Sequence, residues 1–352
     1  MSVSVPFLDL SRHVSVLKDP IKEKLSSVVD SGIFVLGPEI DQLEKRLAEY
    51  CGTAHAVACS SGSEALLMAL MALDLQPGDE VIVPTPSFVC YAPLARMTGA
   101  TPVILETRAE DRFKLNPEML KAAITPRTKL LVLPFPNNPT GAIMTREELA
   151  EIAEVLKDTN ILVLSDEIYA EMTYGREHCS IASIEGMRER TIVVNGFSKS
   201  YAMTGWRLGF TCAPKEITEQ MLKIHQYGIM SSPTTSQFAA IEALRNGDED
   251  IRMMTEEYNR RRRYIYNGLR SIGIESFEPE GAFYIFPHIG QFGLSSDEFC
   301  ERLLYEYKCA IVPGNAFGQG GEGFARISYA YSIKHITQAL ERMEAFVKTL
   351  KK

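Results

Sequence analysis

One lysine stands among small and apolar residues near the middle of this chain. Lys199 follows the apolar run TIVVNGF and lies within NGFSKSYAMTGWRLGF, residues 195–210. Burying an ammonium group is costly unless the group is paired or neutralised. A lysine displaced toward its neutral form is a nucleophile that forms Schiff bases with carbonyl compounds. Lys199 is therefore either a surface lysine at a strand end or the anchor of a carbonyl-bearing cofactor.

A second group of residues could bind a phosphate. In CSSGSEALL, Ser61 and Glu64 fit the capping-box pattern S-x-x-E, which predicts the start of a helix. The free N–H groups of a helix start form an anion site, although a plain helix cap would use the same residues. An arginine can bind a phosphate through two parallel hydrogen bonds. The candidate phosphate contacts are Ser61, Gly62, Ser63, Ser198 and Arg207.

Four further side chains follow expected strand ends. Asp166 and Tyr169, in LVLSDEIY, could contact a ligand, or the aspartate could cap a turn. Asn138, in LPFPNNPTG, could bind a ligand oxygen or build a turn. Phe88, in PTPSFVCYAP, could stack on a planar ligand or belong to the core. With Lys199 and the phosphate contacts, these residues predict pyridoxal 5′-phosphate, an electron sink held by a lysine and an Asp–pyridinium pair.

These residues need a sheet whose strands end close together. From about residue 55, short β-branched apolar runs alternate with helical patterns, which predicts a mostly parallel α/β sheet sandwiched by helices. Such sheets bind ligands at the carboxyl ends of their strands. We expect a large cofactor-binding α/β domain over residues 31–270. We expect residues 1–30 and 271–352 to form a smaller α+β domain.

Composition excludes several classes of function. The 352 residues carry a net charge of −8, which argues against nucleic acid and anionic membranes as partners. We find no apolar run of 18 residues and no signal segment, and therefore expect a cytoplasmic protein. The seven cysteines are scattered and form no C-x-x-C pair, which fits a reducing compartment and argues against a metal site.

From about residue 83 to the C-terminus, the chain resembles the class I and II aminotransferases of the fold type I pyridoxal-phosphate superfamily. Five runs carry the resemblance in order: LPFPNNPTGAIMTREEL, VLSDEIYAEMTYG, NGFSKSYAMTGWRLGF, EGAFYIFP and FARISYA. The resemblance implies that Lys199 forms the Schiff base and moves the substrate proton, while Asp166 pairs with the pyridine nitrogen. It implies that Arg326, in FARISYA, binds the substrate α-carboxylate with Asn138 beside it. The remaining implied contacts are Tyr169 and Asn138 to the ring oxygen, Phe88 to the ring face, and Ser61, Gly62, Ser63, Ser198 and Arg207 to the phosphate.

The first part of the chain departs from that family. VPFLDLSRHV stands where a glycine-containing substrate-binding segment is expected, and residues 5–82 resemble the DegT/DnrJ/EryC1 sugar aminotransferases. This suggests a hybrid chain, natural or engineered, and leaves the choice of substrate open. The departure also removes the tyrosine with which the family reaches the phosphate of the neighbouring subunit.

The resemblance implies an aminotransferase that works by a ping-pong mechanism through a Lys199 aldimine. The expected donors are aromatic or other hydrophobic L-amino acids, and the expected acceptors are 2-oxo acids such as 2-oxoglutarate. It also implies a homodimer, in which residues 34–38 could approach the neighbour's site. Three alternatives remain: a carbon–sulfur β-lyase with the same cofactor, a sugar aminotransferase, and a cofactor-binding chain with little activity. Arg326 argues against a sugar substrate, which carries no α-carboxylate.

Overall fold

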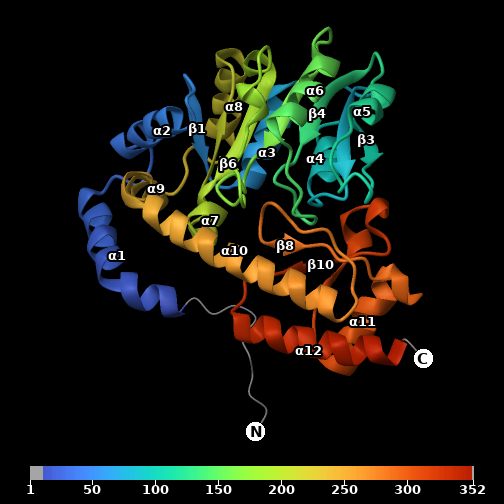
Figure 1. Cartoon of the computed structure of the whole chain (residues 1–352). Helices are drawn as coiled ribbons and strands as arrows, with labels where there is room; N and C mark the ends of the chain where they lie inside the picture. The colour runs from blue at the N-terminus through green and yellow to red at the C-terminus, as the bar shows by residue number, and fades with distance from the viewer. Residues whose placement is uncertain (1–10, 351–352) are drawn as a thin grey trace.

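Seven strands form the larger of two sheets in the computed structural model, which describes residues 11–350 (Figure 1). The strand order is β1-β7-β6-β5-β4-β2-β3. All neighbours from β6 to β3 run parallel, which confirms the α/β class expected from the alternating pattern. The strands are β1 (Ala56–Cys59), β2 (Glu80–Thr85), β3 (Thr101–Glu106), β4 (Thr128–Leu133), β5 (Leu162–Asp166), β6 (Thr191–Gly196) and β7 (Gly209–Cys212).

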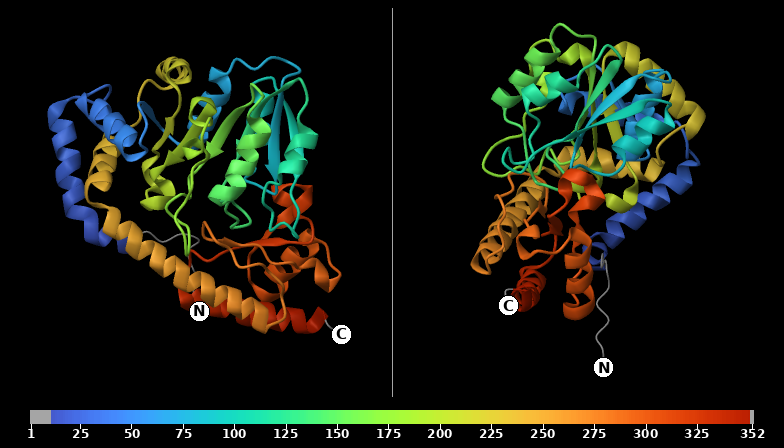
Figure 2. Two further views of the ribbon diagram at one scale, coloured as in Figure 1. Left: turned by 45° about the horizontal axis from the view of Figure 1, so that its top comes forward. Right: turned by 90° about the vertical axis from the view of Figure 1, so that its right-hand side faces the viewer.

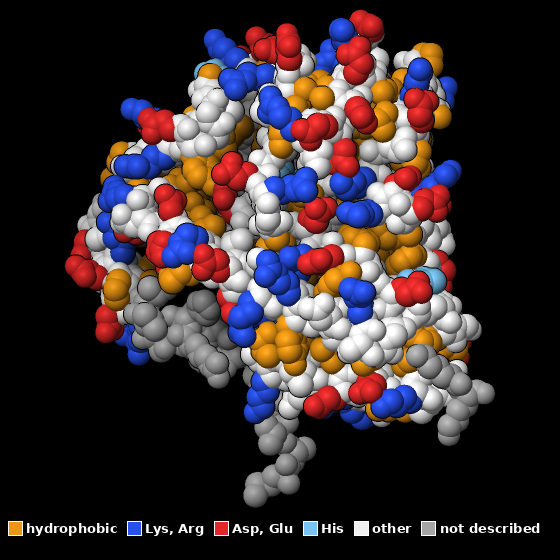
Figure 3. Space-filling model, viewed as in Figure 1, with side chains coloured by type: hydrophobic (Ala, Val, Ile, Leu, Met, Phe, Trp, Pro, Cys, Tyr) orange, Lys and Arg blue, Asp and Glu red, His pale blue; other side chains and the backbone are white. Residues whose placement is uncertain are grey.

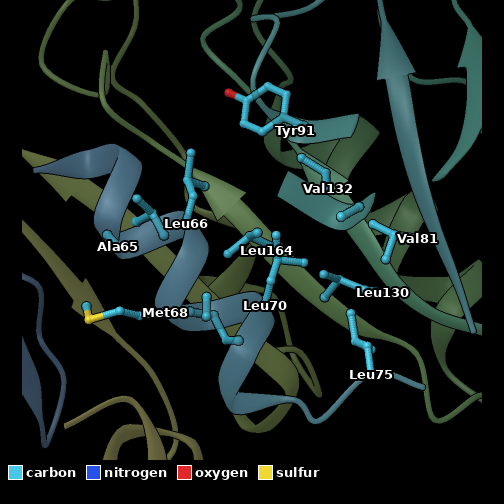
Figure 4. Packing of buried hydrophobic residues seen from close by; sticks show 14 of the residues in the cluster. Ala65, Leu66, Met68, Leu70, Leu75, Val81, Tyr91, Leu130, Val132 and Leu164 are labelled. Carbon is cyan, nitrogen blue, oxygen red and sulfur yellow. The ribbon is translucent and has the colours of Figure 1, made fainter. Parts of the chain in front are cut away.

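Helices cover both faces of this sheet. On β4, Leu130 and Val132 pack against one helix layer, and Leu131 and Leu133 pack against the other, as strand geometry requires. The first layer holds α3 (Gly62–Ala72), α4 (Tyr91–Met97) and α8 (Lys215–Gly228). The second holds α5 (Pro117–Ala123) and α6 (Arg146–Leu156). Figure 4 shows the apolar side of α3 directed at β4 and β5, which fixes α3 against the sheet.

The last strand of the sheet, β7, runs antiparallel to both β1 and β6. The alternating apolar pattern predicted a mostly parallel sheet and gave no sign that this strand is antiparallel. The connection from β6 contains only α7 (Phe197–Ser200) and a 3-10 turn at Thr204–Trp206, so the chain re-enters the sheet from the end at which it left. A parallel strand would need a full crossover. The residues that surround Lys199 therefore stay at the carboxyl end of β6.

A second, three-stranded sheet has the order β8-β10-β9 and is antiparallel. Its strands are β8 (Tyr284–Ile285), β9 (Val312–Pro313) and β10 (Ala325–Ser328). It packs with α10 (Asp248–Ser271), α11 (Ser296–Tyr307) and α12 (Ile333–Leu350) in one buried apolar cluster. Figures 1 and 2 show this unit beside the end of the large sheet that carries α7.

Two further helices pack on β1 and β7, and a third lies outside them. Both α2 (Pro38–Tyr50) and α9 (Thr234–Asn246) bury side chains with these strands in one cluster. Further out, α1 (Ser11–Ser31) packs against α9, where the Lys24 ammonium lies 4.4 Å from the Phe238 ring centre. Residues 1–10 lie outside the described residues. The division into domains at residues 31 and 270 stays a prediction.

Charged side chains of both signs are interspersed over the face drawn in Figure 3. None of the helices within residues 11–350 is both long and apolar enough to cross a membrane. In the same part of the chain, no group of three or more His, Cys, Asp or Glu side chains could hold a metal ion.

Candidate active site

Lys199 lies in α7, in the turn that directly follows β6. Its side chain is partly buried, and burial lowers the pKa of its ammonium group. The positive charges of Arg326 and Arg207 lower that pKa further, whereas the Asp166 carboxylate opposes the shift. The fold therefore brings these four charged residues, which come from three separate segments, within electrostatic reach of one another. A lysine with a lowered pKa is the better nucleophile.

Asp166 ends β5 and is buried. Its Oδ2 accepts a hydrogen bond from the Tyr91 hydroxyl at 2.8 Å, and its Oδ1 accepts one from the Ile168 N–H at 3.2 Å. Burial raises the pKa of Asp166 to about 6, although both hydrogen bonds and the Lys199 charge act in the opposite direction. A cation placed against this carboxylate would restore its charged form.

The helix start predicted at Ser61 is confirmed. Ser61 caps α3, because its Oγ accepts a hydrogen bond from the Glu64 N–H at 3.1 Å. The Glu64 carboxylate in turn accepts a hydrogen bond from the Ser60 N–H at 2.6 Å, one residue earlier than the capping box predicts. The N–H groups of Gly62 and Ser63 belong to the first turn and have no acceptor within the helix. Both residues are at least partly exposed, and a Cβ at Gly62 would meet nothing within 4 Å.

A glycine on the neighbouring strand sets the position of this helix start. A Cβ at Gly209 would lie 2.5 Å from the backbone nitrogen of Gly62. The helix start can therefore approach β7 only because residue 209 has no side chain. Gly209 lies within the RLGF run, but no pattern in the sequence shows which helix it meets.

The two remaining phosphate candidates flank a short loop. Arg207 is exposed, has a positive φ of 55° and donates from Nη1 to the Thr204 carbonyl at 2.9 Å. The Thr204 hydroxyl in turn donates to the Ser198 carbonyl at 2.9 Å. These bonds fold the chain back between Ser198 and Arg207. Ser198 directly precedes Lys199, and Arg207 lies two residues before Gly209.

Arg326, on β10, donates from Nη1 to Asn138 Oδ1 at 3.0 Å. Its guanidinium carbon lies 4.7 Å from the Tyr284 ring centre and 4.8 Å from that of Phe317. Its Nε is buried without a hydrogen-bond partner, and no carboxylate within residues 11–350 forms an ion pair with it. These residues therefore supply no carboxylate for a structural ion pair with Arg326. Asn137, by contrast, builds the turn, accepting from Thr140.

Two aromatic residues complete the predicted set. Tyr169 is buried, and its hydroxyl lies 3.1 Å from that of Tyr284. Phe88 is 39% exposed, with its ring centre 6.4 Å from that of Tyr91, so the alternative of a core residue is wrong. Sequence reasoning missed Tyr91, Tyr284 and Phe317. Tyr91 stands in the same run as Phe88, but neither Tyr284 nor Phe317 carried a signal that pointed to Arg326.

The arrangement fits a phosphorylated, cationic ring with a carbonyl group. A buried carboxylate with a raised pKa can pair with a ring cation, and a lysine with a lowered pKa can bond a carbonyl carbon. The helix start offers free N–H groups to a phosphate. The unpartnered edge of Arg326 offers donors to a carboxylate.

The family profile described as aminotransferase class I and II matches residues 9–343. An aspartate aminotransferase of Pyrococcus abyssi is 40% identical, covering 100% of this chain and 92% of its own length. The aromatic-amino-acid aminotransferase 2 of Thermococcus litoralis is 39% identical, with shares of 100% and 92%. A solved aromatic aminotransferase of Pyrococcus horikoshii OT3 has a TM-score of 0.90 at 40% identity, covering 99% of this chain and 95% of that one. These matches run through the first part of the chain, so they give no support to a hybrid with a sugar-aminotransferase head.

Proposed function

Because the chain belongs to the class I and II aminotransferases, which use pyridoxal 5′-phosphate, we propose that it transfers the amino group of an aromatic or other hydrophobic L-amino acid to a 2-oxo acid such as 2-oxoglutarate. The observation that carries the choice of substrate is Arg326, whose guanidinium lies between two aromatic rings with a buried, unpartnered Nε. Arg326 offers a monocarboxylate its fork of donors, and Tyr284 and Phe317 offer an apolar side chain aromatic contact.

The charges around Lys199 support a monocarboxylate donor over a dicarboxylate. Within the described residues, the cations that act on its pKa are Arg326 and Arg207. We assign Arg207 to the phosphate, so Arg326 is left for the substrate α-carboxylate. Neither of these two cations is then left for a second carboxylate, such as that of aspartate. The relatives named above include both aspartate and aromatic aminotransferases, so their names leave this choice to experiment.

Each proposed site residue has a separate task. When bound, the cofactor supplies a ring that withdraws electrons from the substrate Cα. Lys199 would bond the cofactor's carbonyl carbon, and once the substrate amino group had replaced it there, its free amine would accept the Cα proton. Asp166, oriented by Tyr91 and the Ile168 N–H, keeps a charge opposite the ring nitrogen. The remaining contacts are Tyr169 and Asn138 to the ring oxygen, Phe88 to the ring face, and Ser61, Gly62, Ser63, Ser198 and Arg207 to the phosphate.

Single half-reactions test this function. The cofactor-loaded enzyme is mixed with one amino acid at a time, without a 2-oxo acid, and the loss of the visible absorbance band is followed. We expect phenylalanine, tyrosine and leucine to convert the band faster than aspartate, and 2-oxoglutarate to restore it. Pyruvate release from a sulfur amino acid without any acceptor would instead identify a carbon–sulfur β-lyase. No response to any amino acid would identify a chain that binds the cofactor without turnover.

The exposed apolar side chains support a homodimer. Phe34 and Leu36 are 56% and 55% exposed, and Ile229 and Met230 are 54% and 51% exposed. The two segments lie close together, because the Phe34 carbonyl accepts a hydrogen bond from Thr234 at 2.7 Å. Burial of such side chains against a second copy would be favourable. Light scattering should therefore report a dimer; a monomer that still transaminates would contradict this.

The net charge of −8 argues against nucleic acid and anionic membranes as partners, so we propose a cytoplasmic enzyme that acts on small molecules. Fractionation of the source cells would test the location. We also retain the division into a large domain, residues 31–270, and a small domain from both ends. Limited proteolysis near residues 31 and 270 would test that division.

A further inference from the structure

Tyr284 contacts two proposed site residues that come from different sheets. Its hydroxyl lies 3.1 Å from the Tyr169 hydroxyl, which belongs to the segment after β5 of the large sheet. Its ring centre lies 4.7 Å from the guanidinium carbon of Arg326, on β10 of the small sheet. Tyr284 itself is on β8 and is buried. One side chain therefore joins the substrate-carboxylate arginine to the tyrosine assigned to the cofactor's ring oxygen.

The two hydroxyl groups share one hydrogen bond, so only one of them can donate in it. Burial raises the pKa of Tyr169 and of Tyr284, and each hydroxyl therefore keeps its proton at neutral pH. If Tyr169 donates to Tyr284, its proton is unavailable to any other acceptor. If Tyr284 donates, the Tyr169 proton is free to point at a ring oxygen. The second arrangement alone is compatible with the contact assigned to Tyr169.

The ring of Tyr284 has a separate task. It lies against the Arg326 guanidinium in the range where a cation and an aromatic face attract each other. Phe317 lies against the same guanidinium at 4.8 Å. The two rings and the Asn138 bond leave the guanidinium little freedom to turn. The side of the guanidinium that carries the unpartnered Nε is thereby kept in one orientation.

We propose that Tyr284 is a positioning residue with two functions: its hydroxyl donates to Tyr169 and directs the Tyr169 proton to the cofactor's ring oxygen, and its ring orients Arg326 for the substrate carboxylate. This inference rests on the proposed function. A donor on the ring oxygen weakens that oxygen's hold on the neighbouring Schiff-base proton. Losing the Tyr284 hydroxyl should therefore raise the pH at which the cofactor-loaded enzyme loses that proton.

Two substitutions at Tyr284 and one at Phe317 separate these functions. Tyr284→Phe keeps the ring and removes the hydroxyl, while Tyr284→Leu removes both. Phe317→Leu is the matched control, because it removes a ring from the same guanidinium without touching Tyr169. Thermal unfolding of each variant identifies any that fails to fold, and Tyr284→Phe is the smallest change among them.

Two measurements on the loaded enzymes, neither of which is turnover, give the result. The first is the midpoint of the pH titration of the visible band without substrate. The second is the dissociation constant of 3-phenylpropionate, a carboxylate without an amino group, read from the same band. We expect Tyr284→Phe to raise the midpoint by about half a pH unit or more and to change the dissociation constant less than about twofold. We expect Phe317→Leu to weaken 3-phenylpropionate about threefold or more without moving the midpoint, and Tyr284→Leu to do both.

The double variant Tyr169→Phe/Tyr284→Phe shows whether the hydroxyl acts through Tyr169. Its midpoint should equal that of Tyr169→Phe alone, because the Tyr284 hydroxyl then has no partner to direct. An unchanged midpoint in Tyr284→Phe, or an undiminished shift in the Tyr169→Phe background, would overturn the proposal. Failure of the wild-type enzyme to bind pyridoxal 5′-phosphate at Lys199 would instead reject the proposed function, and the inference with it.

Discussion

Arg326 and Asn138 join the two sheets through one hydrogen bond of 3.0 Å. Arg326 lies on the small sheet, and Asn138 follows β4 of the large sheet. The amide oxygen satisfies Nη1 of the guanidinium, while the buried Nε has no partner. Burying a charge is expensive without compensation. A substrate carboxylate would supply that compensation and would complete a contact between the sheets.

Arg326→Lys should weaken amino-acid and 2-oxo-acid substrates alike, because both carry the α-carboxylate. Lysine keeps the positive charge but loses the two parallel hydrogen bonds of the guanidinium fork. The loss of one such charged bond predicts a rise in KM of roughly 10-fold to 100-fold for both substrates. Steady-state kinetics with each substrate varied in turn measures the effect.

The control for this variant is an amine substrate without a carboxylate, whose reaction should change little. Cofactor affinity should also remain close to that of the wild type. A variant that loses the cofactor or unfolds, yet treats any residual substrate with unchanged affinity, would show that Arg326 is structural.

Lys199→Ala should abolish turnover, because no other amine replaces the one that bonds the cofactor and moves the substrate proton. The phosphate and ring contacts do not involve Lys199, so the variant should still bind pyridoxal 5′-phosphate. Borohydride reduction of the wild-type enzyme, followed by peptide mapping, should place the label on Lys199. A label on another lysine would contradict the assignment. Lys24, whose ammonium lies over the Phe238 ring, is the internal control and should stay unlabelled.

Much of the candidate site could be predicted because strand ends are visible in a sequence. The apolar runs before Asp166, Asn138 and Lys199 predicted three parallel strands, and the carboxyl ends of parallel strands meet at one edge of a sheet. The structure places all three residues there. The direction of β7 could not be predicted in this way, since an apolar run identifies a strand without its direction.

The contacts around the charged residues could not be predicted, because they depend on packing between distant segments. Tyr284 and Phe317 meet Arg326 only where the strands and turns of the small sheet come together. Tyr91 follows β2 and reaches Asp166 at the end of β5, with β4 between the two strands, and an aromatic residue after a strand is equally compatible with the core. For the first 80 residues, local resemblance pointed to sugar aminotransferases. The family profile instead matches residues 9–343, so it includes nearly all of these residues in the class I and II aminotransferases.

The affinity of the apoenzyme for pyridoxal 5′-phosphate should fall as the pH is lowered from 7 to 5. Burial raises the pKa of Asp166 to about 6, so the carboxylate is mostly charged at pH 7 and mostly protonated at pH 5. Only the charged form attracts the ring cation, which predicts a loss of about tenfold in affinity over this range. Equilibrium dialysis at the two pH values measures it.

Asp166→Asn separates this effect from the titration of the cofactor itself. The variant keeps the shape of the side chain but has no charge to lose, so its affinity ratio between the two pH values reports the cofactor alone. We expect a smaller ratio than in the wild type and a turnover lower by orders of magnitude. Equal ratios, or near-normal turnover of Asp166→Asn, would refute the role of the carboxylate.

Glu44 supports the strand that leads to Ser61, and its carboxyl group should make stability depend on pH. Its Oε1 accepts a hydrogen bond from the Ala58 N–H at 3.1 Å. Burial raises its pKa from 4.5 to about 7, although the Ala58 bond and His225 lower it. A carboxyl whose pKa is raised by folding holds its proton more tightly in the folded state. Stability from this group is therefore complete below pH 4.5 and is lost as the pH rises through 7.

Glu44→Gln should remove this dependence, because glutamine keeps an acceptor for the Ala58 N–H and has no proton to lose. The free energy of unfolding of the variant minus that of the wild type should be larger at pH 8 than at pH 5. The expected difference is on the order of 1–2 kcal/mol, a figure reduced for the partial solvent exposure of Glu44. Urea unfolding at both pH values and at one protein concentration measures the difference. Glu49→Gln, on the exposed face of the same helix, controls for the loss of one negative charge. If the wild type and Glu44→Gln differ by the same amount at both pH values, the Glu44 carboxyl does not titrate between them.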